Sequence, residues 1–90
     1  MDTNETYLNH PTFGLLYRVC IVEPNREIFT TLYAQRLFFL VTVSEQGLAF
    51  EPKSRSEARL LIENRLRKLR RIGAKEEYAA LSETYKHIFQ

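Results

Sequence analysis

The sequence predicts an α+β protein in which a small, strongly bent β-sheet is followed by two helices. Short runs rich in β-branched and aromatic residues fill the first half of the 90-residue chain. In the second half, the apolar residues recur with the 3.6-residue period of a helix. Strands followed by helices favour segregated parts over a parallel α/β sheet. We therefore expect a β domain over residues 1–53 and a two-helix extension over residues 54–90.

Four runs in the first half are typical of strands: "TFGLLYRVCIV", "EIFTTLY", "RLFFLVTV" and "LAFE". Pro24-Asn25, Ala34-Gln35 and the "SEQG" turn supply the breaks between them. Four or five short strands within about fifty residues indicate a bent sheet or barrel of the kind seen in SH3-like and Tudor-like modules. Such a module has one thin core.

The second half begins with a capping box, because Ser54 is followed three residues later by Glu57. Gly73 is placed to end this helix in a left-handed conformation. One face of the helix carries Ala58, Leu61, Ile62, Leu66, Leu69 and Ile72. A second helix over residues 74–89 places Tyr78, Leu81, Tyr85 and Ile88 on one stripe, with Phe89 at its edge. The pattern predicts a helical hairpin in which each helix covers the apolar face of the other.

The chain offers few residues that carry out chemistry. Cys20, the only cysteine, sits in an apolar run and is expected to be a buried structural residue. His10 and His87 lie far apart, and neither forms a metal-ligand pattern with a cysteine or carboxylate. The three glycines are isolated, so no phosphate-binding loop is present. We expect no enzymatic activity and no catalytic, metal or cofactor-binding residue.

The location expected for this chain is the cytoplasm. Its N-terminus lacks the basic and apolar regions of a signal peptide. Its longest apolar run is also far shorter than the ~20 residues that a membrane helix needs.

Positive charge is concentrated in the first helix, where residues 54–71 carry seven arginines and lysines against two glutamates. A basic helix beside a Tudor-like sheet favours nucleic-acid binding as an alternative function. The net charge of the whole chain is only +2, and the strand half is acidic, which favours a solvated helix face instead. Arg65 differs from the other cations because it projects within the apolar stripe. It is therefore a candidate anchor between helix and sheet, or between this chain and another.

The stretch "TLYAQRLFFLV" combines a tyrosine, a glutamine and an arginine with a run of apolar residues. At a bend between two strands, Tyr33 and Arg36 would stand at the rim of the sheet beside Leu37. Tyrosine, arginine and exposed aliphatic residues are enriched where proteins bind proteins. The alternative is that several of these side chains pack the small core.

Three stretches, "YLNHPTFGLLY", "TLYAQRLFFLV" and "FEP…R-x-EAR-x-L…NRLR-x-LRR", resemble the cyanobacterial PII-interacting protein X family. The similarity in order and spacing runs over residues 7–71. The last helix keeps mainly the amphipathic pattern and the aromatic positions of the family.

The resemblance implies a small cytosolic adaptor that has a Tudor-like sheet domain, two C-terminal helices and two alternative partners. These partners are the PII trimer, which would sequester the protein when nitrogen is abundant, and the dimeric transcription factor NtcA in its 2-oxoglutarate-bound form, which it would coactivate. The free protein is expected to be a monomer, with no direct contact to nucleic acid or membrane. One face of the sheet would serve both partners through Glu5, Tyr7, Phe13, Leu15, Tyr33, Gln35, Arg36 and Leu37.

Overall fold

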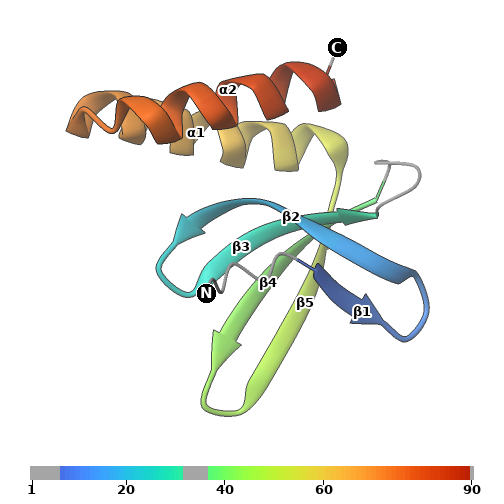
Figure 1. The fold of residues 1–90 in the computed structure, drawn as a ribbon. Helices are drawn as coiled ribbons and strands as arrows, with labels where there is room; N and C mark the ends of the chain where they lie inside the picture. Colours follow the sequence, from blue (N-terminus) through green and yellow to red (C-terminus); the bar gives the residue numbers. More distant parts are fainter. Residues whose placement is uncertain (1–6, 32–36, 90) are drawn as a thin grey trace.

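The protein is a five-stranded antiparallel sheet followed by a helical hairpin (Figure 1). The computed structural model describes residues 7–31 and 37–89. Its strands are β1 (Tyr7–His10), β2 (Gly14–Glu23), β3 (Arg26–Thr31), β4 (Phe38–Ser44) and β5 (Gly47–Lys53), and its helices are α1 (Arg55–Ile72) and α2 (Lys75–Phe89). The α+β class and the bent sheet followed by two helices are confirmed.

The sheet is a simple meander in which the strands neighbour one another in chain order. The pairing of β2 with β3 shifts register between Arg18 and Cys20 and again between Ile21 and Glu23. Such bulges increase the local twist and bend the strand. The ten-residue β2 can therefore curl across the whole sheet (Figure 1).

The first predicted strand differs from the observed one. The run that begins at Thr12 starts as a strand only at Gly14, and β1 precedes it as a separate strand. The His10 Nδ1 accepts hydrogen bonds from the backbone N–H groups of Thr12 (3.0 Å) and Phe13 (3.3 Å). Gly14 follows with φ 78°, a left-handed conformation that glycine adopts at little cost. These features make a tight turn between β1 and β2.

Two apolar clusters lie on opposite faces of the sheet, where one thin core was expected. Side chains alternate between the two faces of a strand, so Ile28 joins one cluster and Phe29 the other. The cluster inside the curl of the sheet consists of Leu16, Phe29, Phe39 and Val41. The cluster under the helices consists of Cys20, Ile28, Phe38, Leu40, Ala58, Ile62, Leu69, Leu81 and Ile88.

Helix α1 begins and ends as the sequence predicts. The Ser54 Oγ accepts from the Glu57 N–H at 3.1 Å, and the Glu57 carboxylate accepts from the Ser54 N–H at 2.9 Å. Gly73 ends the helix with φ 79°. Ile72, the last residue on the predicted apolar face, is 65% exposed. It is also the last residue of α1, next to the turn at Gly73.

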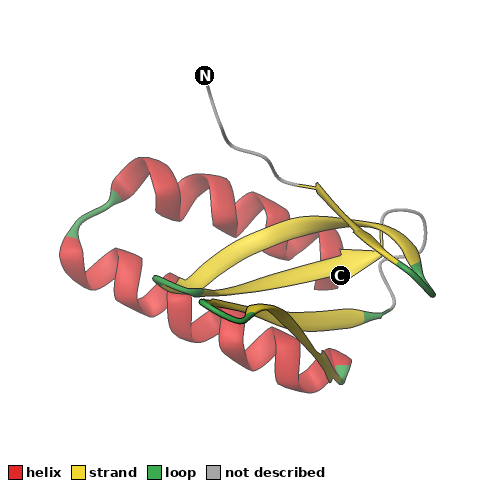
Figure 2. Ribbon diagram, turned by 90° about the horizontal axis from the view of Figure 1, so that it is seen from below, coloured by secondary structure: helices red, strands yellow, loops and turns green. Residues whose placement is uncertain are grey.

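Both helices pack over one face of the sheet (Figure 1), and a view turned by 90° shows them side by side (Figure 2). The expected helical hairpin is therefore present, and both of its helices also pack on the sheet. In α2, Leu81 and Ile88 are buried in the cluster under the helices. The ring of Phe89 also stacks on Phe38 of β4, with centroids 5.7 Å apart. The apolar stripe of each helix is wide enough to contact two neighbours.

Candidate protein-binding surface

The ends of β3 and β4 are held together at one end of the sheet. The Leu37 carbonyl accepts from the Thr31 N–H at 3.2 Å and from the Thr30 hydroxyl at 2.8 Å. Residues 32–36 connect these two ends. Tyr33, Gln35 and Arg36, together with Glu5, lie outside the described residues, so their positions in the predicted site stay predictions.

Strand register brings two more predicted residues to this end of the sheet. Tyr7 pairs with Tyr17, and Leu15 pairs with Asn9. Residues that pair directly point to the same face, and so do residues two apart on a strand. Tyr7 and Leu15 therefore share a face. The neighbouring Leu16 pairs with Thr31, which places Leu15 close to the end of β3.

Phe13 lies at the same end in the turn between β1 and β2. Its ring centroid is 5.1 Å from that of His10 and 5.5 Å from that of Phe39. His10 also packs against Phe50, with centroids 5.1 Å apart. Because its Nδ1 accepts two backbone hydrogen bonds and its ring is surrounded by phenylalanines, His10 organises this turn.

We call Tyr7, Phe13, Leu15 and Leu37 the sheet-end surface. Tyr7 is 52% exposed, while Phe13 and Leu37 are each 44% exposed. Leu15 is half-buried. Single exposed apolar residues are common on protein surfaces, and Leu60 and Ile72 are examples here.

Tyr7 and Leu15 lie on the face opposite to Leu16. Phe13 instead packs against His10 and Phe39 on the face of Leu16, so these residues border the end of the sheet from both faces and not from the one face that was expected. Exposed apolar side chains at the border of a sheet fit a surface that binds another protein.

The surroundings of Cys20 and Glu63 shift the pKa values of these two side chains. Burial raises the pKa of the Cys20 thiol to about 12, so this cysteine is a poor nucleophile and metal ligand. The Tyr85 hydroxyl donates to the Glu63 carboxylate and holds the pKa of Glu63 below its ordinary value. No group of three potential metal ligands occurs within residues 7–31 and 37–89.

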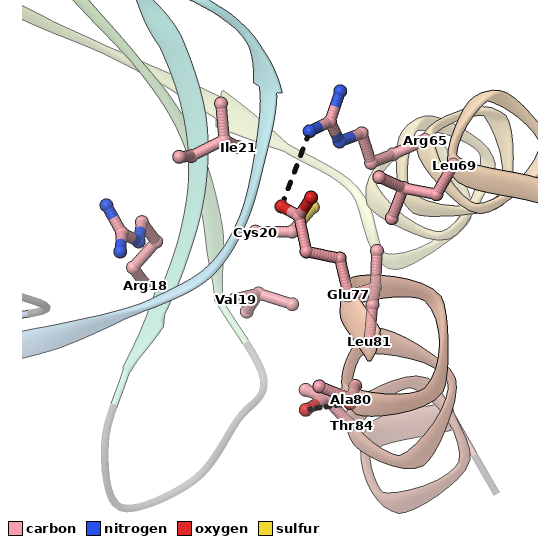
Figure 3. A pocket seen from close by; sticks show the side chains of 10 residues that line it. All are labelled: Arg18, Val19, Cys20, Ile21, Arg65, Leu69, Glu77, Ala80, Leu81 and Thr84. Atoms are coloured by element: carbon pink, nitrogen blue, oxygen red, sulfur yellow. Dashed lines mark hydrogen bonds and ion pairs between the residues drawn. The ribbon is translucent and has the colours of Figure 1, made fainter. Parts of the chain in front are cut away.

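Arg65 connects the two helices. Its Nη2 lies 3.9 Å from the Glu77 carboxylate of α2, beside a cavity of about 290 Å³ between the hairpin and β2 (Figure 3). Arg65 was expected to anchor the helix to the sheet, or this chain to another. In the structure it forms an ion pair between the two helices. Sequence spacing gave no sign of Glu77, because the two residues meet only after the chain reverses at Gly73.

A contact that the sequence does not reveal joins the start of α1 to the end of α2. The Arg55 Nη2 donates to the Ile88 carbonyl at 2.8 Å. The Arg55 guanidinium also lies 4.9 Å from the centroid of the Phe89 ring, within the range of a cation–π interaction. A cation at this position is favourable because the last carbonyls of a helix carry partial negative charge.

Comparison with known proteins identifies the family. Neither described helix is long and apolar enough to cross a membrane. A search of curated proteins found no match. The family model described as PII-interacting protein X matches residues 4–89, which include the sheet and both helices. This description names an interaction with the protein PII. The chain therefore belongs to the PII-interacting protein X family.

Proposed function

We propose that this protein is a cytoplasmic, non-enzymatic adaptor in nitrogen regulation. It binds the PII trimer when nitrogen is abundant. When nitrogen is scarce, it binds and coactivates the NtcA dimer in its 2-oxoglutarate-bound form. Family membership over residues 4–89 supports the interaction with PII. The role with NtcA rests on the resemblance carried by "YLNHPTFGLLY" and "TLYAQRLFFLV".

The sheet-end surface is proposed as the shared contact for both partners, together with Glu5, Tyr33, Gln35 and Arg36. The observation that carries this proposal is the exposure of Tyr7, Phe13 and Leu37 at one end of the sheet. Aromatic side chains that are already exposed in the free protein can be buried by a partner without unfolding anything. If one surface serves both partners, the two complexes exclude each other.

Tyr33→Ala and Arg36→Ala test the shared surface. Truncation of a residue at the rim should lower stability little and weaken binding strongly. Truncation of a buried tyrosine should instead lower the free energy of unfolding by roughly 3–5 kcal/mol. Arginine can also form a bidentate pair with a carboxylate of the partner. Each variant is melted and then tested in pull-downs with PII plus ADP, and with NtcA plus 2-oxoglutarate. We expect normal melting and weaker binding of both partners.

Tyr7→Ala and Leu60→Ala complete this experiment. Tyr7 belongs to the sheet-end surface, whereas Leu60 is equally apolar and 56% exposed but lies on α1. We expect the first substitution to weaken binding and the second to leave it unchanged. Variants at Tyr33 and Arg36 that melt normally and keep both partners would remove these residues from the interface. Loss of only one partner would contradict a fully shared surface.

Nucleic-acid binding by α1 is the second candidate. Lys68, Arg70 and Arg71 form no ion pair with the described part of the chain, which leaves their charge available. Binding through phosphates would weaken steeply as salt rises. Titration of the isolated protein with duplex DNA and with RNA at two salt concentrations distinguishes the candidates. Tight, salt-sensitive binding without any protein partner would favour the nucleic-acid function over the adaptor.

A further inference from the structure

A second hollow lies between α1 and the β2–β3 hairpin. Its volume is about 200 Å³. The apolar part of its lining comes from β2, β4 and α1, and its polar part includes Glu23, Arg26, Arg65 and Lys68. We call it the α1–sheet cleft. It lies away from the sheet-end surface, and the family description assigns nothing to it.

Positive charge in the α1–sheet cleft exceeds negative charge by two. Three cations line it, against the single carboxylate of Glu23. That carboxylate is 3.4 Å from the Arg26 Nη1, and both side chains are largely open to solvent, with 54% and 40% exposed. One exposed pair of this kind leaves Lys68 without an ion-pair partner among the described residues, and the nearest carboxylate to Arg65 is that of Glu77, which does not line the cleft.

The Arg65 side chain is mostly buried, with only 19% of its surface exposed. Its ion-pair partner, Glu77, is 3.9 Å away, and the Glu77 side chain is 67% exposed to solvent. A mostly buried guanidinium is stabilised best by a close, bidentate oxyanion, and this distance does not provide one. Arg65 therefore has donor capacity left, and its side chain borders the cleft.

Lys68 completes the arrangement one helical turn after Arg65. Residues three apart on a helix lie on neighbouring parts of its surface, so the two cations flank one position. Lys68 makes no ion pair with any residue in the described ranges. Arg26 approaches from the opposite wall, on β3. Cations thus reach the cleft from both the helix and the sheet.

We propose that the α1–sheet cleft binds a dianionic phosphate group, either inorganic phosphate or a small phosphomonoester. A dianion offsets the two excess positive charges, which a monocarboxylate would only half offset. Phosphate oxygens match the planar fork of arginine and the point charge of lysine. The apolar part of the lining can contact the carbon atoms of an ester. This inference does not depend on the proposed adaptor function.

The test is a titration of the full-length protein with inorganic phosphate and with glycerol phosphate at about pH 8, followed by two-dimensional NMR of backbone amides. Sodium chloride keeps the ionic strength constant, so that general screening does not change. We expect saturable shifts in β3 near Arg26 and in α1 near Lys68. Tighter binding of the ester would assign the site to an organic phosphate, and equal binding would assign it to the phosphate group alone.

Lys68→Gln is the decisive variant, and Arg71→Gln is its matched control. Both substitutions remove one exposed positive charge from α1, but only Lys68 lines the cleft. Loss of one charge-assisted contact should weaken phosphate binding about tenfold, equivalent to ~1.4 kcal/mol. The control should change affinity by less than about twofold, since an exposed charge outside the cleft acts through screened solvent.

Three results would overturn the proposal. The first is the absence of saturable shifts at any phosphate concentration that leaves the protein folded. The second is an equal loss of affinity in both variants, which would indicate attraction to the whole basic helix. The third is equally tight binding of malonate, which would assign the cleft to dicarboxylates. Because both substitutions are at exposed positions, circular dichroism should confirm that each variant keeps its fold.

Discussion

Ile88→Ala should show whether the sheet and the helices unfold together. Ile88 is 5% exposed and packs with Ile28, Phe38 and Ile62 in the cluster under the helices. The substitution removes three carbon atoms, which corresponds to about 2.4 kcal/mol of lost apolar transfer energy at ~0.8 kcal/mol each. Incomplete collapse of the cavity raises the cost to about 3 kcal/mol. For a domain of this size, Tm should fall by roughly 10–20 °C.

Ile72→Ala is the matched control, because it makes the same chemical change in the same hairpin at a side chain that is 65% exposed. It should change stability by less than about 0.5 kcal/mol. The assay is a thermal melt followed in parallel by far-ultraviolet circular dichroism and by tyrosine fluorescence. One shared transition is expected, because the cluster contains residues from both halves of the chain. Two separate transitions, or an equal loss in both variants, would refute a shared core.

Four further predictions concern the capping box, two titratable groups and the hairpin. Ser54→Ala removes the acceptor of the Glu57 N–H and should lower stability by about 1 kcal/mol, seen as a fall in Tm, while Ser54→Thr should retain most of it. Hydrogen bonds from Ser54 lower the pKa of Glu57 below its ordinary value. The stability that the ionised Glu57 carboxylate contributes is therefore present above the pKa of the unfolded state and is lost as pH falls through the lower pKa of the folded state. Urea titrations across that range should show a smaller loss in Glu57→Gln. Cys20 should resist thiol reagents at about pH 8 until the protein is unfolded, and equal labelling of both states would contradict its burial. Finally, amide hydrogens of α2 should exchange faster than those of β3 because Gly73 can redirect the hairpin; equal protection, both free and PII-bound, would rule this out.

Local signals explain why much of the fold could be predicted. The capping box and the left-handed glycine act through hydrogen bonds within three or four residues, so Ser54 and Gly73 set the ends of α1 regardless of what packs around it. The turn at Pro24-Asn25 likewise depends on residues that are adjacent in the chain. Each of these features appears at its expected place.

Features that depend on distant contacts could not be predicted in this way. Arg55 reaches the Ile88 carbonyl 33 residues away, and the sequence contains no periodic pattern that pairs them. The second apolar cluster depends on how far β2 bends at its two bulges. The exposure of Tyr7 and Phe13 could not be predicted either, because in a sequence an apolar residue that contacts a partner cannot be distinguished from one that packs in the core. Only the family resemblance separated these two possibilities.

The Leu37 carbonyl separates the requirements for folding from those for recognition. It is held by the backbone N–H of Thr31 and the hydroxyl of Thr30, neither of which belongs to residues 32–36. These two hydrogen bonds join β3 to β4 through the backbone of Leu37, and neither of them uses its side chain. That side chain is 44% exposed. Replacing it can therefore change an apolar contact with a partner while the carbonyl that joins the two strands stays in place.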